Sequence, residues 1–172
     1  LIAPLPRDVH IVEIGPCAGV SDEALFELPS DERVKLCDHL SHAGVPCMEV
    51  GSLAEDAQAL PQMMDTQFVL SKIKRNPNVN YQILTPTLES VRLASKYRGL
   101  VADTAVVSLS ANEAFSQYSF GCSMEEKWAE VAMCVAAAVD EGLKVRATLS
   151  CVLGCPEQLH TEFNTETGQH QY

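Results

Sequence analysis

Long apolar runs and positive charge are both scarce in this sequence of 172 residues. No apolar run approaches the roughly 18 residues that a membrane-spanning helix needs, which argues against a membrane span. Lys and Arg total 12 against 23 Asp and Glu, which gives a formal net charge of -11. This balance argues against nucleic acid or an anionic membrane as the main partner, and it disfavours a polyanionic ligand unless the basic residues gather in one place.

Cysteine is present without the pattern of a disulfide framework or a zinc site. The seven Cys are scattered and odd in number, and several lie inside apolar runs, which favours buried, reduced thiols in an intracellular compartment. Cys151 and Cys155 have the spacing of half a zinc site, but no second Cys/His pair follows at suitable spacing. His39 and His42 lie three apart near a predicted helix end, where the helix dipole alone accounts for them.

Short apolar strands alternate with helical stretches over most of the chain. Strands are predicted over residues 9–14, 46–50, 81–85, 104–109 and 145–150. Helices are predicted from Ser30 or Asp31 to Gly44, over 63–74 and 88–97, and from a capping box of Ser123 and Glu126 to Gly142. This alternation predicts about five parallel β/α units and hence an α/β fold. A doubly wound sheet and part of a (β/α)8 barrel both fit the pattern.

The apolar stripes of three predicted helices identify the expected core contacts. They consist of Leu36, Leu40 and Ala43, of Phe68, Val69 and Ile73, and of Trp128, Val131, Val135 and Ala138. Beyond Pro156 the sequence turns polar and loses its periodicity, so residues 157–172 are predicted to form an extended or disordered tail. The predicted organisation is one domain over 1–156 and a tail over 157–172.

Six short blocks occur in order along the chain. They are Val-Glu-Ile-Gly-Pro at 12–16, Met-Glu-Val-Gly-Ser at 48–52, Leu-Pro-Gln-Met-Met-Asp at 60–65, Asn-Tyr-Gln-Ile-Leu-Thr-Pro at 80–86, Cys-Ser-Met-Glu-Glu at 122–126 and Val-Arg-Ala-Thr-Leu-Ser-Cys-Val-Leu-Gly-Cys-Pro at 145–156. Over about residues 6–156 the chain thereby resembles the N-terminal half of the 3-hydroxy-3-methylglutaryl-CoA lyases. The resemblance implies a partial TIM barrel of the first five β/α units, followed by the polar tail.

The resemblance also implies an activity, the cleavage of a CoA ester to acetyl-CoA and acetoacetate. In this family a divalent metal such as Mg²⁺ or Mn²⁺ and a neighbouring Arg stabilise the charge that develops in the reaction. Active members end their first strand with Gly-Pro-Arg-Asp-Gly, where this chain has Cys17 in the Arg position and Ala18 in the Asp position. The family's His-x-His ligands, metal-binding Asn and catalytic Cys loop belong to later strands.

Glu49 is the residue that matches the early active-site set of the family. It is interpreted either as an acid/base residue retained from an ancestor or as a strand-end carboxylate that hydrogen-bonds nearby backbone. Cys17 is interpreted as a reactive thiol or as a passive replacement. Arg92, Lys96 and Arg98 form a small basic cluster that either contacts a phosphate or forms a solvated helix face.

Taken together, these residues favour a catalytically inactive lyase-like protein that acts as a structural or accessory subunit of a larger assembly. We expect no cofactor, no metal site, and a mitochondrial location by resemblance. The alternatives are an active metal-dependent lyase present as a fragment and a module that binds a CoA ester without turnover, which the acidic balance disfavours.

Five units cannot close an eight-stranded barrel, so the first and fifth strands are expected to leave free edges and an apolar inner face. A protein partner or a second copy is expected to cover them.

Overall fold

Five parallel strands form one curved sheet in the order β1-β2-β3-β4-β5. The computed structural model describes residues 8–19, 28–53, 63–155, 163–164 and 169–170. The strands are β1 (Val12–Glu13), β2 (Cys47–Ser52), β3 (Asn80–Leu84), β4 (Thr104–Ser110) and β5 (Lys144–Ser150). Each strand pairs in parallel with the next, so the prediction of parallel strands in sequence order is confirmed.

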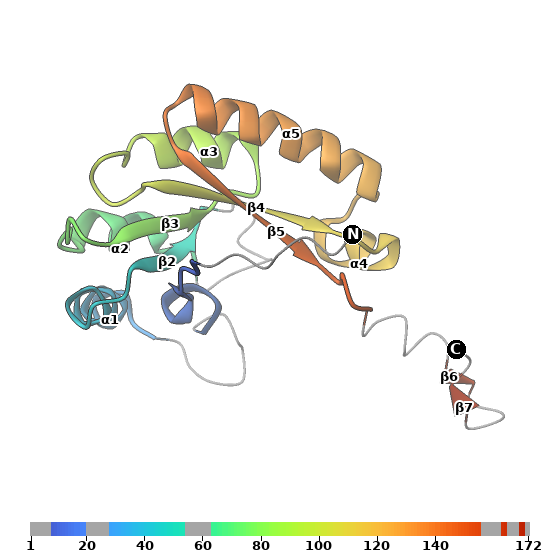
Figure 1. Cartoon of the computed structure of the whole chain (residues 1–172), viewed down its shortest axis with the longest axis horizontal. Helices are drawn as coiled ribbons and strands as arrows, with labels where there is room; N and C mark the ends of the chain where they lie inside the picture. The colour runs from blue at the N-terminus through green and yellow to red at the C-terminus, as the bar shows by residue number, and fades with distance from the viewer. Residues whose placement is uncertain (1–7, 20–27, 54–62, 156–162, 165–168, 171–172) are drawn as a thin grey trace.

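The helices lie along the outer side of the curved sheet (Figure 1). Parallel neighbours need a crossover connection, and the helices provide it. They are the π-helix η1 (Gly15–Gly19) and the α-helices α1 (Ser30–His42), α2 (Thr66–Lys72), α3 (Leu88–Ser95), α4 (Glu113–Phe120) and α5 (Met124–Asp140). The arrangement is part of a (β/α)8 barrel, as the sequence predicts.

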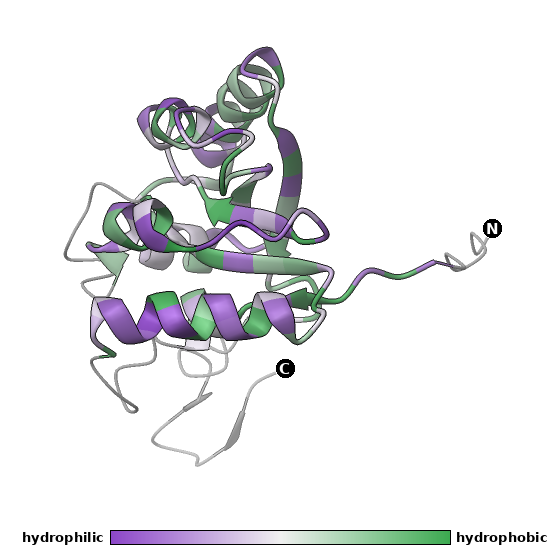
Figure 2. Ribbon diagram, turned by 90° about the vertical axis from the view of Figure 1, so that its left-hand side faces the viewer, coloured by the Kyte–Doolittle hydropathy of each residue, from purple (hydrophilic) through white to green (hydrophobic). Residues whose placement is uncertain are grey.

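The hydrophobic core lies between the sheet and the helices. Every second strand residue points toward the helices, as the pleat requires. These residues include Met48, Val50, Tyr81, Ile83, Ala105 and Val107, which pack with Val69, Val91 and Cys134 from the helices. Figure 2 shows hydrophilic and hydrophobic stretches alternating along the helices, in keeping with one buried and one solvated face.

The inner face of the sheet is largely polar, which corrects the prediction of an apolar inner face. Ser108 and Thr148 lie with their hydroxyls 3.1 Å apart. Thr104 and Gln82 both donate to the side-chain oxygen of Asn80, at 2.9 and 3.1 Å. Hydrogen bonds within and between strands therefore satisfy these side chains without an apolar cover.

The first edge strand of the sheet, β1, is shorter than predicted. β1 has two residues where six were predicted, and its pairing with β2 is limited to Val12 and Glu13. Val9 and Ile11 precede it and are 79% and 73% exposed. Among the strands that the structure describes, β1 has β2 as its neighbour on one side and none on the other.

One helix start was predicted wrongly and one helix was not predicted. The N-cap of α1 is Pro29, without a side-chain hydrogen bond, and Ser30 is already helical. Helix α4 was not predicted at all, although Asn112 caps it through a hydrogen bond from the amide of Phe115 and Gly121 ends it with φ +69°. The Gly ends of α1 and α5 are confirmed, because Gly44 and Gly142 have φ of +91° and +74°.

The predicted helix stripes are correct in part. Val131 and Ala138 are buried, whereas Trp128 is 50% and Phe68 41% exposed. On α1 the buried residues are Arg33, Cys37 and Ser41, so the predicted stripe of Leu36, Leu40 and Ala43 is displaced around the helix. The reason is that Arg33 finds a buried partner, which a periodicity rule cannot anticipate.

Within the tail, the described residues form two short strands, β6 (Phe163–Asn164) and β7 (Gln169–His170), which pair antiparallel. This pairing adds local order to a segment that was predicted as extended or disordered. Among the residues that the structure describes, no helix is long and apolar enough to cross a membrane.

Helix α5 offers a direct test of how the sequence encodes the fold. Ser123 accepts a hydrogen bond from the amide of Glu126 at 3.2 Å, and Glu126 accepts one from the amide of Ser123 at 2.8 Å. Ser123→Ala removes one half of this capping box and is expected to lower the free energy of unfolding by about 1 kcal/mol in urea titrations. Ser119→Ala, an exposed serine of α4, is the control, and an equal loss in both variants would contradict the capping argument.

Candidate functional site

The candidate residues Cys17 and Ala18 lie in η1, directly after β1. The amides of Cys17 and Ala18 donate to the carbonyl of Ile14 at 3.1 and 2.8 Å, and the amide of Gly15 donates to the carboxylate of Glu13 at 2.6 Å. This tight turn buries Cys17 and leaves Ala18 exposed. The structure therefore places the two positions on different sides of the same turn.

Glu49 lies on the inner face of the sheet, where it is 5% exposed. Arg146 of β5 donates from Nη2 to the Glu49 carboxylate at 2.5 Å and from Nη1 to Gln82 Oε1 at 2.7 Å. A buried carboxylate without a cationic or hydrogen-bonding partner would be strongly unfavourable. The Glu49–Arg146 ion pair supplies that partner, whereas the interpretation from sequence names nearby backbone.

Cys17, in η1, contacts the same carboxylate. Burial raises the pKa of the Cys17 thiol far above its usual range, and the charge of Glu49 and a hydrogen bond to its carboxylate raise it further. The thiol therefore stays protonated near neutral pH. This state favours the interpretation of Cys17 as a passive replacement over that of a reactive nucleophile, because the thiolate is the reactive form.

The position of Glu49 depends on an irregularity in β2. The register between β2 and β3 shifts between Glu49 and Gly51, and such bulges redirect neighbouring side chains. A Cβ at Gly51 would lie 2.6 Å from Thr66 Oγ1 and 3.0 Å from Arg33 Nη2. Glycine is therefore required here because α1 and α2 approach the strand so closely.

A second buried ion pair supports this bulge from the helix side. Arg33 of α1 is 1% exposed and forms an ion pair with Asp65, which precedes α2. Its Nη2 also donates to the carbonyl of Val50 at 3.3 Å. Arg33 thus connects two helices to β2 one residue after Glu49.

Sequence reasoning missed both arginines of this site. Arg146 alternates with Val145 and Ala147 on a predicted strand, so its polar face was visible, but its partner lies 97 positions away. Arg33 carried no sequence signal, since a charged residue on a surface helix is normally solvated.

The remaining candidates do not join this site. Cys151 and Cys155 are free cysteines, His42 is exposed with Nδ1 2.6 Å from the carbonyl of Asp38, and Arg92 lies 4.0 Å from Glu89 on the surface of α3. Lys96 and Arg98 are exposed at the end of the same helix.

Most of the chain is similar in sequence to known lyases. No protein-family model matches the chain. It is 38% identical over 152 residues to the cytoplasmic 3-hydroxy-3-methylglutaryl-CoA lyase of Danio rerio, which covers 88% of this chain and 44% of the relative. It is 35% identical over 157 residues to the mitochondrial hydroxymethylglutaryl-CoA lyase of Bos taurus, which covers 90% of this chain and 46% of the relative.

The structural comparison agrees with the sequence comparison. The crystal structure of the HMG-CoA lyase of Brucella melitensis superposes with a TM-score of 0.80 at 30% identity, over 86% of this chain and 50% of the other. The order of the strands, the helices on the outer side and the superposition on this lyase together define part of a (β/α)8 barrel. The chain belongs to the 3-hydroxy-3-methylglutaryl-CoA lyase family, and it spans about half the length of the curated relatives that it matches.

The family assignment corrects one prediction, that of no cofactor. The relatives are lyases of a family that uses a divalent metal, so the prediction is wrong as it was made. Within the ranges that the structure describes, no three His, Cys, Asp or Glu side chains lie close enough to hold a metal ion. The carboxylate of Glu49 is already bound by Arg146. The described residues do not by themselves fit the metal, and its ligands would have to come from outside them.

The state of Cys17 can be measured directly. In timed labelling with a thiol reagent at about pH 8, near the pKa of a free cysteine, Cys17 is expected to react at least about ten times more slowly than the half-buried Cys122, since it is buried and protonated. Peptide mass spectrometry assigns the rates.

Glu49→Gln separates burial from charge in the same experiment. It removes the negative charge that helps to raise the pKa of Cys17, so labelling of Cys17 is expected to accelerate, while the exposed control Glu89→Gln leaves the rate unchanged. Labelling of Cys17 as fast as that of Cys122 in the unaltered chain would contradict the closed geometry.

Proposed function

We propose that this chain is a catalytically inactive relative of the 3-hydroxy-3-methylglutaryl-CoA lyases and serves as a structural or accessory subunit of a larger assembly. The observation that carries the proposal is the engagement of Glu49 by Arg146 at 2.5 Å and by the thiol of Cys17. The charges of this cluster cancel within the chain, so it offers neither a free base nor a free cation to a substrate.

Positions 17 and 18 support the same proposal through the family resemblance. Active relatives place a catalytic Arg and a metal-binding Asp there, whereas Cys17 is a neutral, buried thiol and Ala18 ends in a methyl group. A thiol cannot present the fixed, positive pair of donors that a guanidinium offers to a substrate oxygen. Arg146 does not substitute for it, because both of its Nη atoms are already bound.

The second candidate function is an active lyase of which this chain forms one part. The chain's coverage of 44–46% of its curated relatives favours this candidate, because a barrel draws catalytic residues from the ends of several strands. Under it, Glu49 would be released from Arg146 when the remaining strands and the metal are in place.

A role as a subunit is supported by the two edges of the sheet. β1 and β5 each have one neighbouring strand, and a free edge leaves a row of unpaired backbone groups. Around them Val9, Ile11 and Leu149 are 79%, 73% and 45% exposed. The inner face is polar, so the proposed contact concerns these edges and their apolar flanks.

The mitochondrion remains the proposed compartment by resemblance. The bovine relative is a mitochondrial enzyme and the zebrafish relative a cytoplasmic one, so the family occurs in both places. Fluorescence microscopy of the native full-length protein with a C-terminal tag would decide between them.

A chimera tests whether positions 17 and 18 prevent catalysis. We expect that residues 1–155 of this chain, joined to the remaining half of the bovine lyase, release no acetoacetate from 3-hydroxy-3-methylglutaryl-CoA in the presence of Mg²⁺ or Mn²⁺. The double change Cys17→Arg with Ala18→Asp in the same chimera is expected to restore release, because it returns the cationic donor and the oxygen ligand.

The bovine lyase is the positive control, and circular dichroism establishes that both chimeras fold. Acetoacetate release by the unaltered chimera would overturn the inactive reading and support the second candidate. In the isolated 172-residue chain the double change is expected to restore nothing, since the later strands are also needed.

The partner proposal has its own measurement. Size-exclusion chromatography with light scattering is expected to give a mass above that of a monomer. The contact between the copies is expected to have the usual size of a specific interface, about 1,200–2,000 Å² of buried surface. Ile11→Lys, at the exposed approach to β1, is expected to return the chain to a monomer, while Val139→Lys, at another exposed apolar position on α5, is the control. A monomeric mass of the unaltered chain, together with cooperative thermal unfolding, would refute an edge contact between copies of this chain.

A further inference from the structure

The amino-terminal ends of the strands form a hollow of about 880 Å³. It lies at the end of the barrel opposite to η1, which follows the carboxyl end of β1. Four of the 12 Lys and Arg residues of the chain line it, namely Arg75, Arg98, Lys144 and Arg146. We call this feature the basic hollow.

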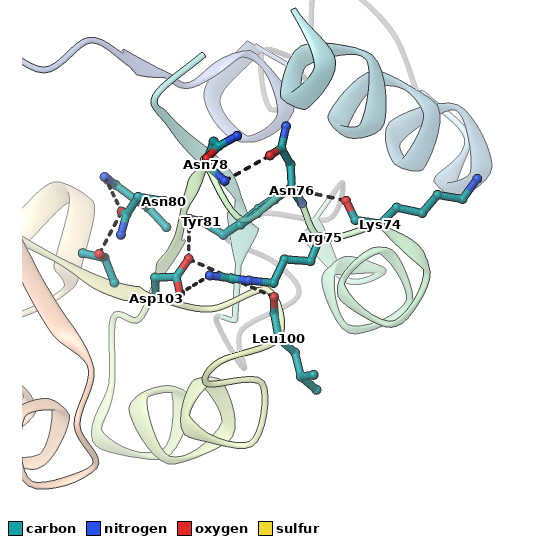
Figure 3. Close-up of polar contacts among 10 residues, drawn as sticks. Lys74, Arg75, Asn76, Asn78, Asn80, Tyr81, Leu100 and Asp103 are labelled. Atoms are coloured by element: carbon teal, nitrogen blue, oxygen red, sulfur yellow. Dashed lines mark hydrogen bonds and ion pairs between the residues drawn. The ribbon is translucent and has the colours of Figure 1, made fainter. Parts of the chain in front are cut away.

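One arginine of the basic hollow is fixed by the chain itself. Arg75 donates from both Nη atoms to the carboxylate of Asp103, at 3.0 and 3.1 Å, and from Nη1 to the carbonyl of Leu100 at 2.7 Å (Figure 3). The amide of Tyr81 donates to the same carboxylate at 2.9 Å. Asp103 is thereby saturated with donors, and it neutralises Arg75 alone.

Two other cations of the hollow have no such partner. Among the described residues, no ion pair or side-chain hydrogen bond of Arg98 or Lys144 is present. A Cβ at Gly142 would lie 3.1 Å from Arg98 Nη1, so the guanidinium packs over the turn that leads into Lys144. The backbone amide of Lys144 donates to the carbonyl of Asp103 at 3.0 Å, which places this lysine beside the fixed Arg75–Asp103 pair.

The charges of the lining residues do not cancel, even with the ion-pair partner of Arg146 included. Asp103 is the acidic residue of its lining and offsets Arg75, and Glu49 offsets Arg146. Two positive charges remain, on Arg98 and Lys144. In a chain with a formal net charge of -11, such a concentration of uncompensated positive charge is a local reversal of the overall field.

We propose that the basic hollow binds a small polyanion, a molecule with at least two phosphate or carboxylate groups. Arg98 provides a planar fork that suits an oxyanion and Lys144 a compact charge beside it. Asn78 and Asn80 add amide groups to the lining. The volume is that of an ordinary small-molecule site, and the acidic remainder of the surface excludes long polyanions such as nucleic acid.

In the basic hollow, four of the few basic residues gather in one place. Such a gathering is the requirement that the acidic sequence places on the binding of a polyanionic ligand. The polyanion proposal goes beyond the proposed function, because it concerns the amino ends of the strands and requires no catalysis. The chemistry does not separate phosphates from carboxylates, and the experiment therefore includes both.

The test is a titration of the 172-residue chain with inorganic pyrophosphate and, separately, with citrate, at constant ionic strength, followed by calorimetry and thermal melting. At least one of the two probes is expected to bind and to raise the melting temperature, since a ligand that binds the folded state stabilises it. The double variant Arg98→Gln with Lys144→Gln is expected to weaken binding by about tenfold or more, because it removes both uncompensated charges.

Arg92→Gln with Lys96→Gln is the matched control. It removes two positive charges from the same end of α3, and neither residue lines the hollow. Affinity should change by less than about twofold in this control, as screening of distant surface charge predicts. An equal loss in both double variants, or no binding of either probe in the millimolar range, would overturn the proposal.

Amide chemical shifts of the unaltered chain keep the test decisive if a variant fails to fold. The amides of Gly99, Gly142 and Lys144 are expected to shift on addition of the probe that binds, whereas that of Cys17, at the opposite end of the barrel, is expected to stay in place. Shifts spread evenly over the surface would refute a defined site.

Discussion

The ion pair between Glu49 and Arg146 is the interaction on which the shape of the inner face depends. It joins β2 to β5, although β3 and β4 lie between them. In a flat sheet these strands would be about 14 Å apart at the usual strand spacing, so a 2.5 Å contact between their side chains requires strong curvature. Gln82 of β3 receives the second Nη of Arg146 and fills the space between them. The same contact that neutralises the site therefore holds the sheet in its barrel-like curl.

The curvature also explains how five strands avoid an exposed apolar interior. The apolar residues of each strand face the helices, and the alternate positions carry Thr104, Ser108 and Thr148, whose hydroxyls find partners on the sheet. Stability thus resides on the outer side, where the core is complete. Among the described residues, Arg146 Nε, Thr66 Oγ1 and Ser116 Oγ are buried without a hydrogen-bond partner, and β1 and β5 each have one neighbouring strand.

The sequence predicted the fold well and the site poorly, for one physical reason. Strands and helix ends depend on local chemistry, such as the capping box at Ser123 and the left-handed glycine at Gly142, which neighbouring residues determine. The family resemblance identified Cys17, Ala18 and Glu49 from short sequence blocks, which are local signals as well. Arg33 and Arg146 are buried or half-buried against partners that lie 32 and 97 positions away in the sequence, and no local rule contains such pairs. Helix α4 was missed because its own apolar pattern is weak, with Ser116 as its buried residue.

The combination of Cys17 and Ala18 also leaves the net charge of this part of the chain unchanged. Relative to the Arg and Asp that the family resemblance places there, it removes one positive and one negative charge together. Position 17 lies buried beside the Glu49–Arg146 pair, so a cation there would join a buried cluster, whereas position 18 is exposed and would hold an Asp side chain in solvent. At position 17 an additional cation without an acidic partner would be far more unfavourable than a neutral replacement. The thiol of Cys17 fits the neutral result, because it donates a hydrogen bond to Glu49 and, with its raised pKa, carries no charge. Loss of both family residues therefore leaves the remaining ion pair, the curvature and the fold intact.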